Sequence, residues 1–366
     1  MAVEPVLAST LWSAHQHEQP TSNLAEPPSK RRKLATNCKP LDDALSGGFD
    51  YGAIHCISAE TDAGSKQLSQ ALIASHLLDS EDAEATVIDT INSFDVRGLH
   101  QVLVAELRLD GNGDSREKAV QVLGRVRIMK AFDFVGLTEC VAELREHLEA
   151  DGHPRPSRET QAQQPPRGTV GDSEDEDEML DSPSPRKEPQ VRKASPATIS
   201  SPDVKQSSNL LLIDNISHVT LPLLKNSHIQ GQALLTSFMR SLAHLTRAHQ
   251  LCTVVHNAAS VHSPASVSAQ VPSPAEDRPS IFSSCTLRPA LGRTFAYLVD
   301  VHLLLHRVPL EAEDAKAVYG TQGPGRVAGQ RKVVSVLEVL TDRHSDRVGR
   351  WAAFQPDTDG KLIGIT

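Results

Sequence analysis

A short polar loop between a buried strand and a helix is the first place where this sequence could do chemistry. Residues 59–66 read AETDAGSK and lie between an apolar run and a helical pattern. Backbone amides and a helix N-terminus face an anion in such a loop. A phosphate-binding loop reads G-x-x-x-x-G-K-[ST]. Here Gly64 keeps the second glycine, but Ala59 replaces the first, Ser65 replaces the lysine and Lys66 replaces the hydroxyl residue. The loop therefore lies in the right place between a strand and a helix, but most of the residues that would contact a phosphate and a magnesium ion are replaced.

A second candidate group is the aspartate that ends an apolar strand. Residues 210–215 read LLLIDN, so that Asp214 follows four large apolar residues. A carboxylate at the carboxyl end of a central parallel strand lies at the ligand crevice and can hold a magnesium ion. Apolar strands that end in aspartate are common, so this signal is weak by itself.

The elements that must position these groups follow from the spacing of apolar residues. The expected strands are 53–58, 86–89, 125–129, 210–215, 252–256, 297–305, 333–340 and 350–354, and the expected helices are 96–107, 134–148 and 233–248. Strands separated by helices of this length favour crossover connections and a parallel sheet. A polar turn between the last two strands indicates an antiparallel hairpin. The sequence therefore predicts an α/β fold with a mostly parallel central sheet and a C-terminal β-hairpin.

Two polar segments flank or interrupt this pattern. Residues 1–36 are expected to form a disordered tail, and residues 151–208, rich in Pro, Ser and charge, a disordered insertion. The two halves of the core are then 37–150 and 209–366, the second with a loose loop at 258–288. Four Ser-Pro pairs and an acidic run in the insertion suit phosphorylation, which is a hypothesis from composition.

A basic cluster in the tail is typical of a nuclear import signal. Lys30, Arg31, Arg32 and Lys33 follow one another directly, as in peptides that nuclear import receptors bind. The sequence therefore predicts a nuclear protein.

Bulk composition excludes several classes of protein. The net charge of −9 argues against a protein that coats nucleic acid, so any DNA contact must be local. The five cysteines lack C-x-x-C spacing, which favours free thiols in a reducing compartment. No apolar run approaches the roughly 20 residues that span a bilayer, so a soluble intracellular protein without a membrane partner is expected.

The second half of the chain carries a family resemblance. Residues 287–295 read LRPALGRTF and lead into AYLVDVHLLL, which closely resembles the RecA-type recombinase paralogues of eukaryotes, most of all the D-type paralogue. Leu41-Asp42, Gly47-Gly48 and Gly52 resemble the start of the same core. The resemblance covers residues 38–150 and 209–366 and implies a RecA-like P-loop NTPase core. The helical N-terminal domain that is common in the family is replaced here by the short basic tail.

Departures from the family pattern imply a degenerate nucleotide site. Hydrolysing members carry a water-activating glutamate where this chain has Ile91, and an isoleucine accepts no proton. His256-Asn257-Ala258 replaces the family's γ-phosphate sensor, and Ser65 replaces the lysine. No ATP hydrolysis and no cofactor are expected, or at most ATP and magnesium bound weakly. The residues that would bind them are Gly64, Ser65, Lys66, Gln67 and Asp214.

The resemblance also implies weak contact with single-stranded DNA. The first candidate DNA-binding loop, residues 217–231, offers Lys225, and the second is flanked by Arg288 and Arg293. The expected partners are other recombinase paralogues in a hetero-oligomer and the recombinase filament.

The expected function is therefore that of an accessory subunit that assists recombinase filaments in homologous-recombination repair. One alternative is a DNA-dependent ATPase whose missing groups come from a partner subunit. Another is a RecA-fold scaffold of a different assembly, such as the Elongator complex, although the LRPALGRTF block argues against it. A third is a RecA relic that binds only protein.

Overall fold

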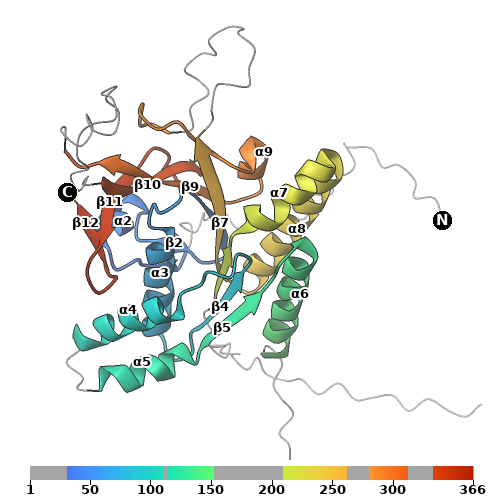
Figure 1. Cartoon of the computed structure of the whole chain (residues 1–366). Helices are drawn as coiled ribbons and strands as arrows, with labels where there is room; N and C mark the ends of the chain where they lie inside the picture. The colour runs from blue at the N-terminus through green and yellow to red at the C-terminus, as the bar shows by residue number, and fades with distance from the viewer. Residues whose placement is uncertain (1–30, 110–113, 152–208, 262–279, 312–332, 366) are drawn as a thin grey trace, which may run out of the picture. The chain divides into compact units, whose positions relative to one another are not determined.

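The computed structural model describes residues 31–109, 114–151, 209–261, 280–311 and 333–365 (Figure 1). The chain divides into one compact unit of residues 1–145 with 207–366, and a second of residues 146–206. Nearly all described residues belong to the first unit. The predicted tail and insertion fall largely on residues 1–30 and 152–208, outside the described residues.

Ten strands of the described residues form one large sheet, with the order β12-β11-β10-β9-β3-β7-β6-β4-β5 and with β8 paired to β7. The strands are β3 (Ala53–Ala59), β4 (Glu84–Asp89), β5 (Val126–Lys130), β6 (Asn209–Asp214), β7 (Cys252–Val261), β8 (Leu287–Pro289), β9 (Val301–Pro309), β10 (Val333–Asp342), β11 (Trp351–Pro356) and β12 (Leu362–Ile365). The block from β9 through β3, β7, β6 and β4 to β5 is parallel. The strands from β9 to β12 pair antiparallel. The predicted α/β class, the mostly parallel sheet and the C-terminal hairpin are confirmed.

Helices cover both faces of the parallel block (Figure 1). They are α2 (Lys39–Ala44), α3 (Ser65–Asp79), α4 (Val96–Leu109), α5 (Ser115–Leu123), α6 (Phe134–Asp151), α7 (Ile216–Asn226), α8 (His228–Ala248) and α9 (Gly292–Ala296). The first helices, α3 to α5, lie on one side, and α6 to α8 lie on the other. Every residue of β3 except the last is buried, as expected for a strand covered on both faces.

Most strand predictions hold to within two residues, with two exceptions. Strand β7 was expected to end at residue 256 but continues to Val261, so the loose loop predicted for residues 258–288 is wrong at its start, and β8 occupies its end. The strand expected from residue 297 begins only at Val301. The preceding residues form a turn after α9, in which the amides of Tyr297 and Leu298 donate to the carbonyls of Thr294 and Phe295.

The prediction that residues 217–231 form a DNA-binding loop is wrong, because the segment is helical. Residues 217–231 form most of α7 and the start of α8, and Lys225 lies exposed in the last turn of α7. The side-chain oxygen of Asn215 accepts a hydrogen bond from the amide of Ser217 at 3.0 Å, which caps the helix. Helix α5 was not predicted, because its sequence is mostly polar.

The predicted tail ends earlier than expected. Residues Lys33–Leu34 form β1, which pairs antiparallel with β2 (Phe49–Asp50). The last residue of the basic cluster, Lys33, therefore belongs to a strand of the folded domain.

Two chemical expectations can be compared with the described residues. All five cysteines lie buried as free thiols. In the part of the chain that the structure describes, none of the helices is both long and apolar enough to cross a membrane.

Candidate functional site

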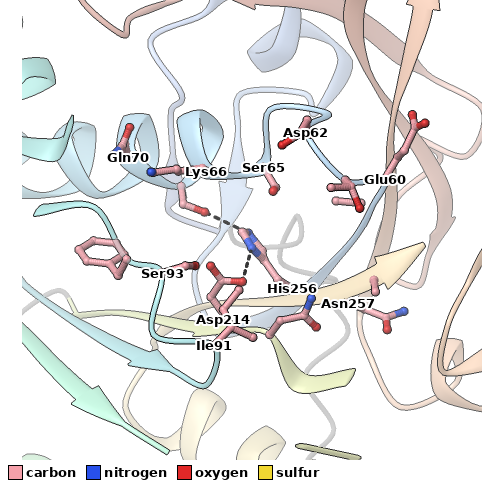
Figure 2. Close-up of a pocket in the computed structure, with 16 residues that line it drawn as sticks. Glu60, Asp62, Ser65, Lys66, Gln70, Ile91, Ser93, Asp214, His256 and Asn257 are labelled. Atoms are coloured by element: carbon pink, nitrogen blue, oxygen red, sulfur yellow. Dashed lines mark hydrogen bonds and ion pairs between the residues drawn. The ribbon is translucent and has the colours of Figure 1, made fainter. Parts of the chain in front are cut away.

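The carboxyl ends of the parallel strands meet at one edge of the sheet. Asp89 of β4 is in register with Asp214 of β6, and Ser58 of β3 is in register with Asn257 of β7. The loops that follow these strands therefore surround one cavity of about 220 Å³. Its lining includes Glu60, Asp62, Ser65, Lys66, Ser69, Gln70, Ile91, Ser93, Phe94, Asp214, Asn215, His256 and Asn257 (Figure 2). This is the crevice where α/β sheets of this type bind ligands.

The loop after β3 needs its glycine for packing. Gly64 has a φ of +95° and precedes the first residue of α3. A Cβ at this position would lie 3.0 Å from the hydroxyl oxygen of Ser335 on β10, in a backbone conformation that L side chains rarely adopt. The one glycine kept from the phosphate-binding pattern thus has a structural reason to be glycine.

Lys66 does not point at the centre of the cavity. Its ammonium group forms an ion pair with Asp95 at 3.1 Å. Figure 2 shows the side chain directed away from Asp214 and His256. The backbone amide of Gly98 and then the ammonium of Lys66 lower the pKa of Asp95, so this carboxylate stays charged. The lysine that could have approached a phosphate is thus engaged elsewhere.

His256 joins three elements at the centre of the site (Figure 2). Its Nδ1 lies 3.2 Å from Oδ1 of Asp214 on β6, and its Nε2 lies 3.0 Å from Oγ of Ser69 on α3. The ring is only 3% exposed. Burial raises the pKa of Asp214, but the charge and the hydrogen bond of His256 lower it more, so that the pKa falls below its ordinary value. The carboxylate that was expected to hold magnesium is thus bound by a side chain of the same protein.

Ser69, His256 and Asp214 have the order of a serine–histidine–aspartate triad, but the surroundings of Ser69 do not suit a nucleophile. Ser69 is 4% exposed and lies in the second turn of α3. Backbone amides at that depth in a helix already donate to carbonyls one turn earlier. A nucleophile would need nearby unoccupied amides to stabilise an oxyanion. The three side chains therefore act as a link between elements.

The loop after β4 presents an apolar side chain to the cavity. The carboxylate of Asp89 accepts hydrogen bonds from the amides of Ile91, Ser93 and Phe94 at 3.1, 3.3 and 2.9 Å. These bonds fix the loop with Ile91 in the cavity wall, 41% exposed. Since the carboxylate of Asp89 is used to hold the loop, it does not supply the general base that Ile91 lacks.

The charges around the cavity oppose a bound polyphosphate. The acidic side chains in its lining are Glu60, Asp62 and Asp214, and the basic ones are Lys66 and His256. Glu60 pairs with Arg307 at 3.5 Å, while Lys66 and His256 each face a carboxylate. Within the described ranges, no group of three or more His, Cys, Asp or Glu side chains could hold a metal ion. A magnesium nucleotide at this site would have to displace His256 from Asp214 and Asp95 from Lys66.

The structure brings together some of the predicted site residues and separates others. Ser65, Lys66 and Asp214 line the cavity, Gly64 lies beside it, and Gln67 does not contribute to its lining. The candidate DNA-contacting residues are elsewhere: Lys225 in α7, Arg288 in β8 and Arg293 in α9. Both arginines are already engaged in interactions.

Sequence reasoning did not find the role of Ser69. The only feature of the sequence that pointed to Ser69 was its position four residues after Ser65, which places both on the same face of α3.

A comparison with the models of known protein families finds none that matches this chain.

Proposed function

We propose that this chain is a nuclear, non-hydrolysing accessory subunit of a recombinase-paralogue complex with a RecA-like core. It would assist the assembly of recombinase filaments on single-stranded DNA in homologous-recombination repair. The support for the family is the resemblance of residues 287–295. They include β8, which pairs with the cavity-lining strand β7, and most of α9.

One observation carries the non-hydrolysing part of the proposal. Asp214, the expected magnesium ligand, is bound by His256 at 3.2 Å. Phosphoryl transfer depends on a metal ion, a positioned cation and an oriented nucleophile. In this chain the residues that would provide each of the three are replaced or already engaged. By the family resemblance, Ser65 stands in place of the lysine and Ile91 in place of the base, and both residues line the cavity. A subunit with this site would contribute by binding partners rather than by turning over ATP.

Contact with DNA remains a secondary part of the proposal. Exposed Lys225 on α7 could approach a phosphate, whereas Arg288 and Arg293 would have to exchange present interactions for a phosphate. A few such contacts would give weak, salt-dependent binding. The affinity for DNA would then depend mainly on the neighbouring subunits.

Affinity purification of the tagged chain from dividing cells, followed by mass spectrometry, tests the assignment. Recovery of other recombinase paralogues is the expected result. Recovery of a transfer-RNA-modifying assembly, or of no RecA-type partner, would overturn the recombination role and leave the fold untouched.

The rival proposal, an ATPase completed by a neighbouring subunit, also uses Asp214. It would require His256 to release the carboxylate when the complex forms. The two proposals therefore differ in what Asp214→Asn does to a purified complex: nothing in the first, and loss of turnover in the second.

A further inference from the structure

The basic cluster that was expected to act as a free nuclear address is partly built into the domain. Lys33 and Leu34 form β1, with Lys33 opposite Asp50 and Leu34 opposite Phe49. The carbonyl of Arg32 accepts a hydrogen bond from the amide of Tyr51 at 3.0 Å. The backbone of this segment is thus already paired with a strand of its own chain.

The side chains of two of the four basic residues are engaged as well. Arg32 forms an ion pair with Asp79 at 2.5 Å, and its guanidinium lies 4.9 Å from the ring centroid of Tyr51. The ammonium of Lys33 lies 3.2 Å from Asp50 and also donates to the carbonyl of Leu45 at 3.2 Å. A carboxylate and an aromatic ring around a basic side chain are the contacts that an acidic peptide-binding groove would offer.

The residues that follow the basic cluster anchor the segment to the hydrophobic core and to a helix. Leu34 is 3% exposed and belongs to the main hydrophobic core. Its carbonyl lies so close to Gly48 that a Cβ there would come within 2.1 Å of the oxygen. Two residues further on, Thr36 donates from its amide and its hydroxyl to the carboxylate of Asp42, at 2.7 and 2.9 Å. Nothing larger than glycine at position 48 is compatible with β1 in this place.

We propose that the folded domain masks its own import signal. An import receptor that binds an extended basic peptide in an acidic, aromatic groove would need the backbone and side chains of Arg32 and Lys33. Those groups are used by Tyr51, Asp79, Asp50 and Leu45. Receptor binding therefore requires β1 to detach, and the receptor and the β1–β2 pair compete for one segment. The inference rests on the nuclear address in the proposed function and is independent of the recombination role.

The competition can be measured by comparing two forms of the same segment. A synthetic peptide of residues 26–37 (EPPSKRRKLATN) and the full chain are each titrated with a purified import receptor that recognises short basic peptides. The peptide is expected to bind at least about tenfold more tightly, which corresponds to about 1.4 kcal/mol for detaching β1. Equal affinities would overturn the proposal, and so would the absence of binding by the peptide, since the segment would then be no import signal.

Two full-chain variants release β1 without changing the basic residues. Gly48→Ala places a methyl group against the carbonyl of Leu34, and Leu34→Ser removes the apolar anchor. Both should bring the affinity of the full chain towards that of the peptide while circular dichroism still reports a folded core.

The matched control is Gly292→Ala. This glycine also has a positive φ, +70°, but a Cβ there would meet nothing within 4 Å. It should leave receptor binding at the wild-type value. Tightening by Gly292→Ala as well as by the release variants would mean that general destabilisation is the cause, and would overturn the proposal.

Discussion

Nδ1 of His256 lies 3.2 Å from Oδ1 of Asp214, inside the crevice formed by the carboxyl ends of the parallel strands. The other nitrogen of the same ring lies 3.0 Å from the hydroxyl of Ser69. A single side chain thus connects β6, β7 and α3. In a nucleotide-binding site of this architecture, a ligand and its metal would connect the corresponding elements. Here the connection is part of the chain.

The isolated protein should not bind ATP with useful affinity. The cavity lining carries Glu60, Asp62 and Asp214, and Lys66 is paired with Asp95, so a triphosphate would meet more negative than available positive charge. Isothermal titration with ATP, with and without magnesium, should give a dissociation constant of about 1 mM or weaker. Binding in the micromolar range that requires magnesium would contradict this account of the site.

Replacing His256 should lower the free energy of unfolding more than replacing Lys66. His256→Ala leaves a buried serine hydroxyl without its partner, exposes Asp214 to an unfilled cavity and should cost about 2–3 kcal/mol. Lys66→Ala removes an exposed ion pair, with both side chains more than a third exposed, and should cost at most about 1 kcal/mol. Urea denaturation of both variants measures the difference. Equal costs would show that the His256 link is not structural.

A buried arginine should be among the most sensitive positions in the chain. Arg347 is 1% exposed, lies 2.8 Å from Asp50, forms an ion pair with Asp342 and donates to the carbonyl of Leu45 at 2.9 Å. Arg347→Ala would remove the buried cation between two carboxylates, leaving Asp50 with Lys33 as its remaining cation and Asp342 with hydrogen bonds alone, at a cost of about 3–5 kcal/mol.

Arg350→Ala is the matched control for that variant. Its guanidinium donates to the hydroxyl of Ser46 at 3.0 Å on the exposed surface, so its loss should change stability by at most about 0.5 kcal/mol. Thermal melts of the two variants decide the point. Comparable melting temperatures would contradict a structural role of the Arg347 network.

Because two histidines are buried, we expect the free energy of unfolding to fall in mild acid. Burial lowers the pKa of His55 and of His302 from 6.5 to about 4, because it disfavours the charged ring. The unfolded chain therefore takes up protons first, and the free energy of unfolding should fall as the pH drops from about 6.5 to about 4. Each site contributes on the order of 3 kcal/mol at full effect. Urea titrations at about pH 7.5 and about pH 5 test this, and equal stability at both pH values would refute it.

The sequence predicted the sheet well because the signal is local. Runs such as residues 53–58 and 210–214 are mostly apolar, which is typical of strands buried on both faces. The helices in residues 216–231 were not predicted, because the resemblance to a recombinase implied a loop there and because Pro222, which disfavours a helix interior, lies inside α7.

The site was only partly predictable, for a different reason. The substitutions at Ser65 and Ile91 can be read from the chain, since each concerns one position in a pattern. The contact between His256 and Asp214 depends on β7 lying beside β6, and the pair of Lys66 with Asp95 depends on how two loops fold. Such relationships need three-dimensional neighbours that no spacing in the sequence reports.

The most direct test of the central claim is ATP turnover by the complex that purifies with this chain. Turnover is measured with single-stranded DNA present, once with the wild-type subunit and once with Asp214→Asn, at equal subunit composition. The account predicts identical rates, because Asp214 is bound by His256 and takes no part in hydrolysis. A rate that falls about tenfold or more in the variant would contradict it and would assign catalysis to this subunit.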